Sequence, residues 1–160
     1  MRRKDREITD IVEIKDIIRN CKTCHVAMVD DGLPYVVPLS FGYEINENVL
    51  SLYFHSAQEG RKMDILHKNN TVCFDMCCEG EPVNAKKTPC NSGYYYSSVI
   101  GNGKVEFVAD VAEKMKALTL LLKHQADIDV TFTEQHAKSV CVYKIVTNDF
   151  TGKKKLRPAE

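Results

Sequence analysis

Three strand-like segments follow one another between residues 25 and 56, and only short turns separate them. They are HVAMV (25–29), PYVVPLSFGYEI (34–45) and VLSLYFHS (49–56), and each is rich in β-branched or aromatic residues. The turns between them are Asp30-Asp31-Gly32 and Asn46-Glu47-Asn48. Turns this short join antiparallel neighbours, whereas parallel strands need a crossover of about a dozen residues or more. The sequence therefore predicts an antiparallel meander and excludes a doubly wound parallel sheet.

The rest of the chain adds helices and further strands to this meander. Apolar spacing predicts helices at 9–20, with Thr9 as the cap, at 58–68 and at 111–124, and a helical turn at 133–138. Strands are expected at 71–78, 94–110 and 140–150, with a polar loop at 79–93. Residues 1–8 and 151–160 are expected to be peripheral. We therefore expect one domain over residues 1–160, with a mainly β (α+β) fold of about six antiparallel strands in a barrel and helices packed outside.

The charge balance limits the classes of partner. The chain has 160 residues, with 22 Lys plus Arg and 22 Asp plus Glu, so its formal net charge is zero. Such a chain lacks the broad positive surface of a nucleic-acid-binding protein, and the cationic residues 153–155 are interpreted as a solvated tail. No apolar stretch reaches the roughly 20 residues of a membrane span. The opening MRRKDREITD has no apolar core behind its cations, so we expect no secretory signal and a cytoplasmic location.

The seven cysteines favour reduced thiols, because the number is odd and Cys77 and Cys78 are adjacent. Cys21 and Cys24 form a CxxC pair, which raises the question of redox or metal chemistry. A redox pair of this type follows a thioredoxin-like strand, whereas a helical pattern precedes this one. A zinc site needs a second pair, and Cys77, Cys78 and Cys90 do not form one. We therefore expect no metal and favour incidental thiols.

The stretch LYFHSAQEGRKMDIL places two cations, Arg61 and Lys62, at the expected start of a helix. The positive end of the helix dipole disfavours cations there, so a bound phosphate is one explanation. Ser56 and Glu59 have the spacing of a capping box, and Gly60 would let another group approach the first turn closely. The other explanation is a self-capped helix whose cations are solvated, and Glu59 supports it because this side chain would already serve the free amides.

Two residues near these segments carry further expectations. Pro38 lies inside the run 34–45 and cannot donate to a β-ladder, so one side of that strand is expected to be unpaired or bulged. His55 lies at a strand end and shares one face with Tyr53, while Phe54 lies on the other face. A lone histidine is more often a structural hydrogen-bonding group than a catalyst. No G-x-G-x-x-G motif follows a strand, so a Rossmann-type nucleotide site is not expected.

Several motifs occur together in one order along the chain. They are MRRKDREI at the start, PYVVPLSFGY (34–43), LYFHSAQEGRK (52–62), SSVIGNGKVEFV (97–108) and TGKK (151–154). With them the chain resembles, nearly end to end, the flavin-binding split-barrel proteins related to pyridoxamine 5'-phosphate oxidase. Within these it looks most similar to the nitroimidazole-resistance (Nim-type) branch. The resemblance implies a six-stranded antiparallel split β-barrel and a homodimer with FMN at the subunit interface.

The resemblance also implies a set of cofactor-binding residues. They are Pro38, Leu39, Ser40, Phe41, Phe54, His55, Ser56, Arg61, Lys62, Ser97 and Ser98. Arg61 and Lys62 would hold the FMN phosphate with Ser56 nearby, and Ser97 and Ser98 would contribute near the same side. The strand from Pro38 to Phe41 would lie along the flavin ring. His55 would approach the flavin and is the expected catalytic residue.

The function implied by this resemblance is FMN-dependent oxidoreduction. Reduced flavin would pass electrons to a small-molecule acceptor such as a nitroaromatic ring, and His55 would donate a proton or a hydrogen bond. The reducing equivalents would come from NAD(P)H or from a partner reductase, because the sequence has no dedicated nicotinamide-binding motif. A flavin- or haem-binding module without turnover is a second interpretation. Pyridoxamine 5'-phosphate oxidase activity is a third and ranks lower, because the chain is short for that enzyme.

Overall fold

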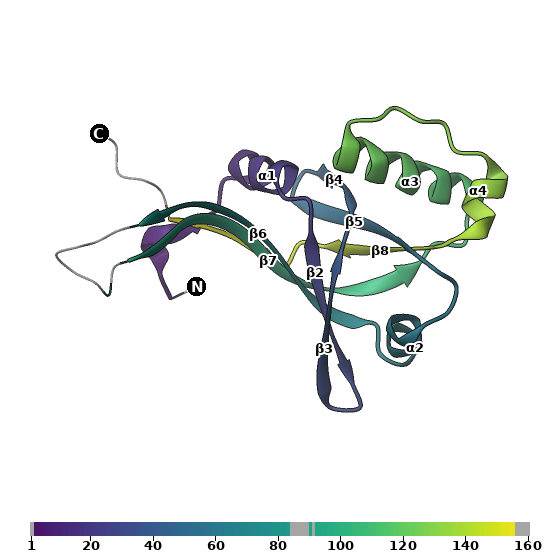
Figure 1. Ribbon diagram of the computed structural model, residues 1–160, viewed down its shortest axis with the longest axis horizontal. Helices are drawn as coiled ribbons and strands as arrows, with labels where there is room; N and C mark the ends of the chain where they lie inside the picture. Colours follow the sequence, from purple (N-terminus) through teal and green to yellow (C-terminus); the bar gives the residue numbers. More distant parts are fainter. Residues whose placement is uncertain (1, 84–89, 91, 156–160) are drawn as a thin grey trace.

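The chain folds around one antiparallel β-sheet that curves into an open barrel (Figure 1). The computed structural model describes residues 2–83, 90 and 92–155. The strands are β1 (Glu7–Ile8), β2 (Cys24–Asp30), β3 (Leu33–Leu39), β4 (Gly42–Asn46), β5 (Val49–Ser56), β6 (Thr71–Val83), β7 (Gly93–Phe107), β8 (Cys141–Thr147) and β9 (Phe150–Lys155). The helices are α1 (Ile11–Asn20), α2 (Arg61–Lys68), α3 (Val111–Ala126) and α4 (Glu134–Ser139), and a short 3₁₀ turn, η1, spans Lys4–Arg6.

The order of the strands confirms the predicted fold class. They pair in the order β3-β2-β6-β7-β8-β5-β4, and β9 pairs with β7 and β1. Strands β3 and β4 follow each other in the chain but stand at opposite ends of this order, so the barrel is split between them. Pro38 lies in the edge strand β3, which among the described strands pairs with β2 alone, so the prediction of an unpaired side is confirmed.

The expected count of six strands was wrong, because the described residues form nine. The run 34–45 divides into β3 and β4 at Ser40 and Phe41, where the Phe41 ring turns into the core and is fully buried. The run 140–150 divides into β8 and β9 because the hydroxyl of Thr147 accepts a hydrogen bond from the N–H of Asp149 at 2.9 Å and turns the chain. Local side-chain bonds of this kind compete with continued strand pairing.

The expectation of a peripheral tail from residue 151 was wrong for residues 151–155. These residues belong to β9, which pairs with β7 and β1, and Gly152 packs closely against Ile8 and Ile14. The loop expected at 79–93 is also shorter, because β6 continues to Val83 and β7 begins at Gly93. Residues 84–89, 91 and 156–160 lie outside the described part of the chain.

Helices α1 and α3 begin at side-chain caps and bury apolar faces against the sheet. The carboxylate of Asp10, and not Thr9 as expected, caps α1 by accepting from the N–H of Val12 at 2.9 Å. Asp110 caps α3 by accepting from the N–H of Glu113 at 2.8 Å. Figure 1 shows α3 and α4 together on one side of the barrel, with α2 at a different side. No helix in the described segments is long and apolar enough to cross a membrane.

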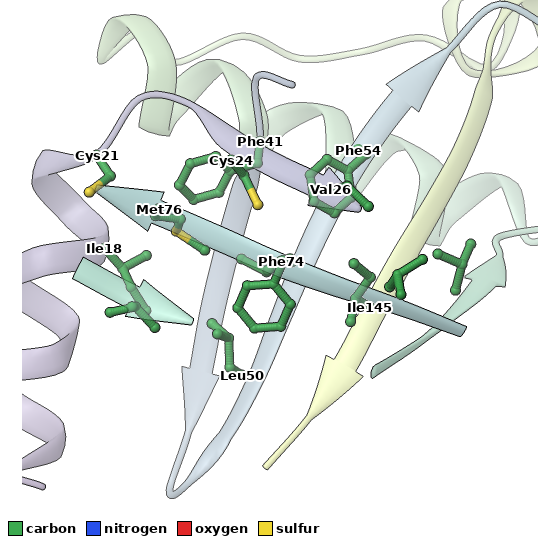
Figure 2. Close-up of a cluster of buried hydrophobic side chains, with 14 of the residues drawn as sticks. Ile18, Cys21, Cys24, Val26, Phe41, Leu50, Phe54, Phe74, Met76 and Ile145 are labelled. Atoms are coloured by element: carbon green, nitrogen blue, oxygen red, sulfur yellow. The ribbon is translucent and has the colours of Figure 1, made fainter. Parts of the chain in front are cut away.

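The interior of the barrel is one apolar cluster to which most strands contribute. Figure 2 shows Val26, Phe74, Leu50 and Ile145 meeting in it, with Ile18 entering from α1. A second, smaller cluster lies under α3 and consists of Tyr53, Val108, Ala117, Leu118 and Val142. Strand β5 therefore supplies both clusters from its two faces, with Phe54 inside the barrel and Tyr53 under the helix.

Strand β7 changes partners at two glycines. It pairs with β9 up to Gly101 and with β8 from Val105 onward. A Cβ on Gly101 would lie 2.5 Å from the Phe74 ring and 2.6 Å from the backbone oxygen of Asp149, and a Cβ on Gly103 would lie 2.5 Å from a methyl group of Ile145. The two halves of the barrel join where these glycines leave no room for a side chain.

We expect Gly103→Ala to destabilise the fold by about 1–3 kcal/mol, because the added methyl overpacks the contact with buried Ile145. The midpoint of urea unfolding measures this change. Lys104→Ala is the matched control: its side chain is exposed on the same strand, so we expect a change within about 0.5 kcal/mol. Equal stability of the two variants would show that the close crossing does not constrain the fold.

Candidate functional site

The turn before α2 differs from the predicted capping box. Helix α2 begins at Arg61 and its N-cap is Gly60, with no side-chain cap bond, so the predicted cap by Ser56 and Glu59 was wrong. Ser56 is instead the last residue of β5 and pairs with Cys141. Gly60 has a φ of 133°, a conformation that L-residues with a side chain rarely adopt. The first amides of α2 therefore lack the side-chain acceptor that the sequence suggested.

Arg61 is held by the β2–β3 hairpin. Its Nε and Nη2 donate to Asp30 Oδ2 at 3.2 Å and 3.1 Å, and its guanidinium carbon lies 4.5 Å from the centre of the Tyr35 ring. The Arg61 side chain is 60% exposed, so this ion pair is partly screened by solvent. The Arg61 guanidinium is therefore held at the start of α2, and the Asp30 carboxylate already balances part of its charge.

Lys62 is the less balanced of the two cations. Its side chain is partly buried, and its Nζ lies 5.6 Å from the centre of the Tyr143 ring. Burial lowers the pKa of Lys62, and within the described part of the chain no carboxylate forms an ion pair with it. Burying a cation without an anionic partner is costly. An anion bound beside Lys62 would therefore offset the cost of burying this ammonium group without a partner.

Tyr143 forms the floor beneath Lys62. Its ring is fully buried and stacks on Phe54 with the ring centres 5.3 Å apart. The Tyr143 hydroxyl has no hydrogen-bond partner among the described atoms, and burial raises its pKa. A buried hydroxyl without a partner is uncommon in proteins and itself carries a desolvation cost. Lys62 and Tyr143, which lie against each other, therefore each carry an unbalanced polar group: a charged ammonium on Lys62 and a neutral hydroxyl on Tyr143.

His55 lies on the outer face of β5, next to the helices. It pairs with Val142 on β8 and lines a pocket of about 380 Å³ under α3 and α4. Burial lowers the pKa of His55 from its ordinary value of 6.5, and the positive charge of Lys62 lowers it further. His55 is therefore neutral at pH 7 and can donate a hydrogen bond from one ring nitrogen and accept one at the other.

The remaining predicted residues lie in two places, Pro38–Phe41 at the end of the edge strand β3 and the turn into β4, and Ser97 and Ser98 on β7. Pro38 and Ser40 are exposed and Leu39 is partly buried, whereas the Phe41 ring packs 4.6 Å from His124 in the core. The backbone oxygen of Phe41 accepts from Gln125 Nε2 at 2.9 Å. Ser97 and Ser98 pair with Cys78 and Cys77 on β6. Both serines are partly exposed.

Within one chain Arg61 lies far from Pro38, whereas Phe41 lies near the end of β5, because Gly42 pairs with Tyr53, two residues before His55. Asp30, which holds Arg61, pairs with Leu33, whereas Pro38 pairs with His25 about five residues along the same ladder, roughly 17 Å away. Ser98 lies further in the same direction, because its partner Cys77 follows Asp75, the partner of His25. Within one protomer, Arg61, Lys62, Ser56 and His55 form the helix-end group, and Pro38–Phe41 with Ser97 and Ser98 form the mid-sheet group.

Three contributors to the helix-end group were missed from the sequence. Asp30 was interpreted only as a turn residue, and Tyr35 and Tyr143 only as strand residues. The position of Asp30 at the end of a hairpin could have suggested a partner for a cation. Nothing in the local sequence around Tyr143 indicates that a cation lies above its ring, because that contact joins residues 81 positions apart.

In the described part of the chain, neither the cysteines nor a further pocket adds a chemical centre. Cys21 and Cys24 are buried, burial raises the pKa of both thiols, and the Cys21 thiol also contacts Cys78. Among the described residues no three metal-binding side chains are grouped as for a metal ion. A pocket of about 480 Å³ near the end of α3 is lined by Arg19, Lys22 and Lys123. Each of these three cations already has an oxygen partner, in Asp16, His124 and Asp127 respectively, so the pocket is not an open anion site.

A protein-family model for pyridoxamine 5'-phosphate oxidase matches residues 10–154. The chain belongs to the pyridoxamine 5'-phosphate oxidase family. This extent covers the barrel, both groups of site residues and the helices. No curated protein matched the chain.

Comparison with solved structures indicates a branch within this family. A candidate 5-nitroimidazole antibiotic resistance protein from Bacteroides thetaiotaomicron shares 34% identity, covers 92% of this chain and 86% of its own, and superposes with a TM-score of 0.79. The flavocytochrome Anf3 from Azotobacter vinelandii shares 20% identity over 99% and 73%, with a TM-score of 0.82. An FAD- and haem-binding protein from Mycobacterium smegmatis shares 18% identity over 97% and 76%, with a TM-score of 0.77. The first supports the Nim-type branch of the family, and the other two show the fold alone.

We expect Lys62→Met to raise the pKa of His55, because the substitution removes a positive charge that disfavours the imidazolium. NMR titration of the His55 ring protons measures this change. Lys68→Met, at the other end of α2, is the matched control and should leave the titration unchanged. An unaltered His55 titration in Lys62→Met would show that the two side chains are not electrostatically coupled.

Proposed function

We propose that this protein binds FMN and uses the reduced flavin to pass electrons to a small organic acceptor such as a nitroaromatic ring. The observation that carries the proposal is the partly buried Lys62 ammonium, which has no carboxylate partner in the described part of the chain. The 34% identity to a candidate 5-nitroimidazole resistance protein supports the class of acceptor.

The helix-end group fits a phosphate. Lys62 supplies an unbalanced positive charge, Arg61 supplies a second one that is partly balanced by Asp30, and the free amides of the first turn of α2 supply donors. Gly60 has open space where a Cβ would be, so the backbone can approach an anion closely. Ser56 at the end of β5 would add a hydroxyl donor. Charge-assisted hydrogen bonds of this type contribute about 1.5–3 kcal/mol each.

The flavin ring would lie against the mid-sheet group of a second chain. In one protomer Pro38 lies roughly 17 Å along the β2–β3 ladder from the end at which Asp30 holds Arg61, and we propose that a homodimer completes the site. The outer face of the sheet suits such a contact, because Val29, Val36 and Ile100 are 47%, 52% and 48% exposed. Pairing across β3, β2, β6 and β7 places their side chains on one face. In a two-fold dimer each chain supplies one group to each of two equal sites.

The chain's own residues would bind and orient the cofactor and control one proton. Pro38–Phe41, Ser97 and Ser98 would contact the ring, with Phe41 contributing its backbone because its side chain is buried. Phe54 is also buried and would contribute only through its backbone. Bound flavin supplies the electron transfer itself. His55, neutral at pH 7, would hydrogen-bond the acceptor or hold the proton that it takes up.

Pyridoxamine 5'-phosphate oxidase activity is a second candidate, because the matching family model carries that description. Both activities would use the same phosphate residues, and a product assay with pyridoxamine 5'-phosphate separates them. A binding module without turnover would hold a chromophore but reduce no acceptor, and its absorbance spectrum distinguishes flavin from haem. NAD(P)H and a partner reductase are the two candidate donors, and the cytoplasmic location stays a prediction.

We expect Lys62→Ala to lose most of its FMN, since it removes the unbalanced cation, and Arg61→Ala to lose less, because Asp30 already pairs with Arg61. Flavin absorbance per chain after gel filtration measures retention. Lys68→Ala, an exposed cation of the same helix, is the control and should retain flavin like the parent protein. Full flavination of Lys62→Ala would contradict the phosphate assignment.

We expect His55→Ala to keep its flavin and to slow flavin reoxidation by a 5-nitroimidazole roughly 10²-fold, the lower end of general acid–base effects. Anaerobic stopped-flow absorbance, after reduction with dithionite, measures the rate. His67→Ala, on the exposed side of α2, is the matched histidine control. The absence of any acceptor-dependent reoxidation in the parent protein would overturn the oxidoreductase proposal.

A further inference from the structure

Cys21 and Cys78 bring two thiols together between α1 and the sheet. Cys21 directly follows α1, is 2% exposed and belongs to the buried cluster inside the barrel, and in Figure 2 its side chain lies between α1 and β6. Cys78 lies on β6, is partly buried and packs against the same cluster. The Cys78 side chain interacts directly with the Cys21 thiol. Thiols from two elements that are distant in the chain therefore face each other.

One backbone oxygen fixes the position of both cysteines. The Cys78 sulfur lies 3.9 Å from the backbone oxygen of Ile17, in the last turn of α1. The backbone N–H of Cys21 donates to that same oxygen at 3.1 Å. Cysteines joined by a disulfide have Cα atoms about 4.4–6.8 Å apart, so they must lie on immediately neighbouring segments. The shared acceptor atom shows that Cys21 and Cys78 lie on such segments.

The CxxC spacing of Cys21 and Cys24 does not make Cys24 the partner of Cys21. Residues three apart lie on one face when the chain between them is helical. Cys21 instead has extended backbone angles, with φ −80° and ψ 131°, and Cys24 is the first residue of β2. Residues 21–24 therefore lack the helical turn that would bring these two thiols onto one face.

Cys77, the neighbour of Cys78, points to the other face of β6. Successive side chains of a strand alternate between its two faces. Cys77 is exposed and pairs with Ser98, whereas Cys78 pairs with Ser97 and its sulfur contacts α1. A thiol next to Cys78 in the sequence is therefore directed away from Cys21.

The two facing thiols differ in their access to solvent, which sets the order in which they react. Cys78 is partly exposed, so a small peroxide reaches its sulfur first. Cys21 is almost fully buried, and burial raises the pKa of its thiol, so Cys21 is a poor nucleophile toward dissolved reagents. Its contact with Cys78 nevertheless places it beside the sulfur that is oxidised first. Cys21 is therefore suited to resolve an oxidised Cys78.

We propose that Cys21 and Cys78 form a redox-modification site, which a hydroperoxide converts into a reversible disulfide between α1 and β6. The Cys78 sulfur attacks the O–O bond of hydrogen peroxide, becomes a sulfenic acid and releases water. The Cys21 sulfur then displaces hydroxide from the Cys78 sulfur, and this hydroxide leaves as a second water with the thiol proton of Cys21. Two thiols are oxidised and one peroxide is reduced to two waters. This is a site of covalent modification and not a further catalytic centre.

The disulfide would act on the stability of the barrel. It would close a loop that contains β2 to β5 and α2 (Figure 1), and a closed loop restricts the unfolded chain. In a reducing compartment the thiol form is the resting state, and a disulfide that forms there is transient. Oxidation would therefore stabilise the fold for as long as the peroxide persists.

Peptide mapping of the full-length native protein tests the assignment. Protein that has been reduced with dithiothreitol and then freed of it is treated with hydrogen peroxide, blocked with N-ethylmaleimide and digested without reductant. Mass spectrometry is expected to show a cross-linked Cys21–Cys78 peptide that dithiothreitol cleaves. Cys78→Ser should abolish this peptide, whereas Cys77→Ser, on the other face of β6, is the matched control and should form it like the parent protein.

Thermal unfolding provides a second readout. We expect the peroxide-treated parent protein to unfold about 5–10 °C above its reduced form, because the bridge closes a long loop. Cys78→Ser should show no such rise on oxidation, and because Cys78 is only partly buried, this variant should fold and unfold near the reduced parent protein.

Three results would overturn the proposal: a disulfide that joins Cys21 to Cys24, a Cys78 sulfinic acid beside an unmodified Cys21 thiol, or an equal rise in Tm for the parent protein and Cys78→Ser. Neither readout needs flavin or an electron acceptor. Failure of the proposed function would therefore leave this test unaffected, and its failure would leave the proposed function standing.

Discussion

The fold depends on the change of partners by β7 at Gly101 and Gly103. One strand must pair with β9 in one half of the barrel and with β8 in the other, and it can do so only where no side chain separates it from Phe74 and Ile145. The barrel is also split between β3 and β4, which stand at opposite ends of the strand order. The open edge and the outer face of β3 that result are the surfaces to which we assign the second chain.

The same barrel leaves the start of α2 electrostatically unbalanced. Arg61 reaches Asp30 on the β2–β3 hairpin, but the next residue points toward Tyr143, where the described chain offers it an aromatic ring and no carboxylate. An aromatic face stabilises a cation only modestly, by about 0.5–2 kcal/mol, and does not neutralise it. An arrangement in which one neighbouring cation is paired and the other is partly buried without a carboxylate favours the proposed anion-binding role over a solvated helix end.

The sequence predicted features that depend on near neighbours and missed those that depend on distant ones. The hairpins between residues 25 and 56 were predictable because turn length alone decides that the strands are antiparallel. The cap of α1 shifted from Thr9 to Asp10, since adjacent residues of similar capping ability cannot be ranked without the helix axis. The capping box at Ser56 failed because pairing with Cys141, 85 residues away, extends β5 through Ser56. Residues 151–155 were placed in a tail for the same reason, as their pairing with β7 is long-range.

In our proposal Lys62 would link the phosphate site to the proton chemistry that we assign to His55. Burial, together with the charge of Lys62, keeps the pKa of His55 below the ordinary value. A phosphate bound at Lys62 would offset that charge and raise the pKa of His55 toward neutrality, where a general acid is most effective. The pocket lining contains no charge that would oppose this shift. Binding of the cofactor phosphate would therefore also prepare His55 to carry a proton, although the two groups lie on different elements of the fold.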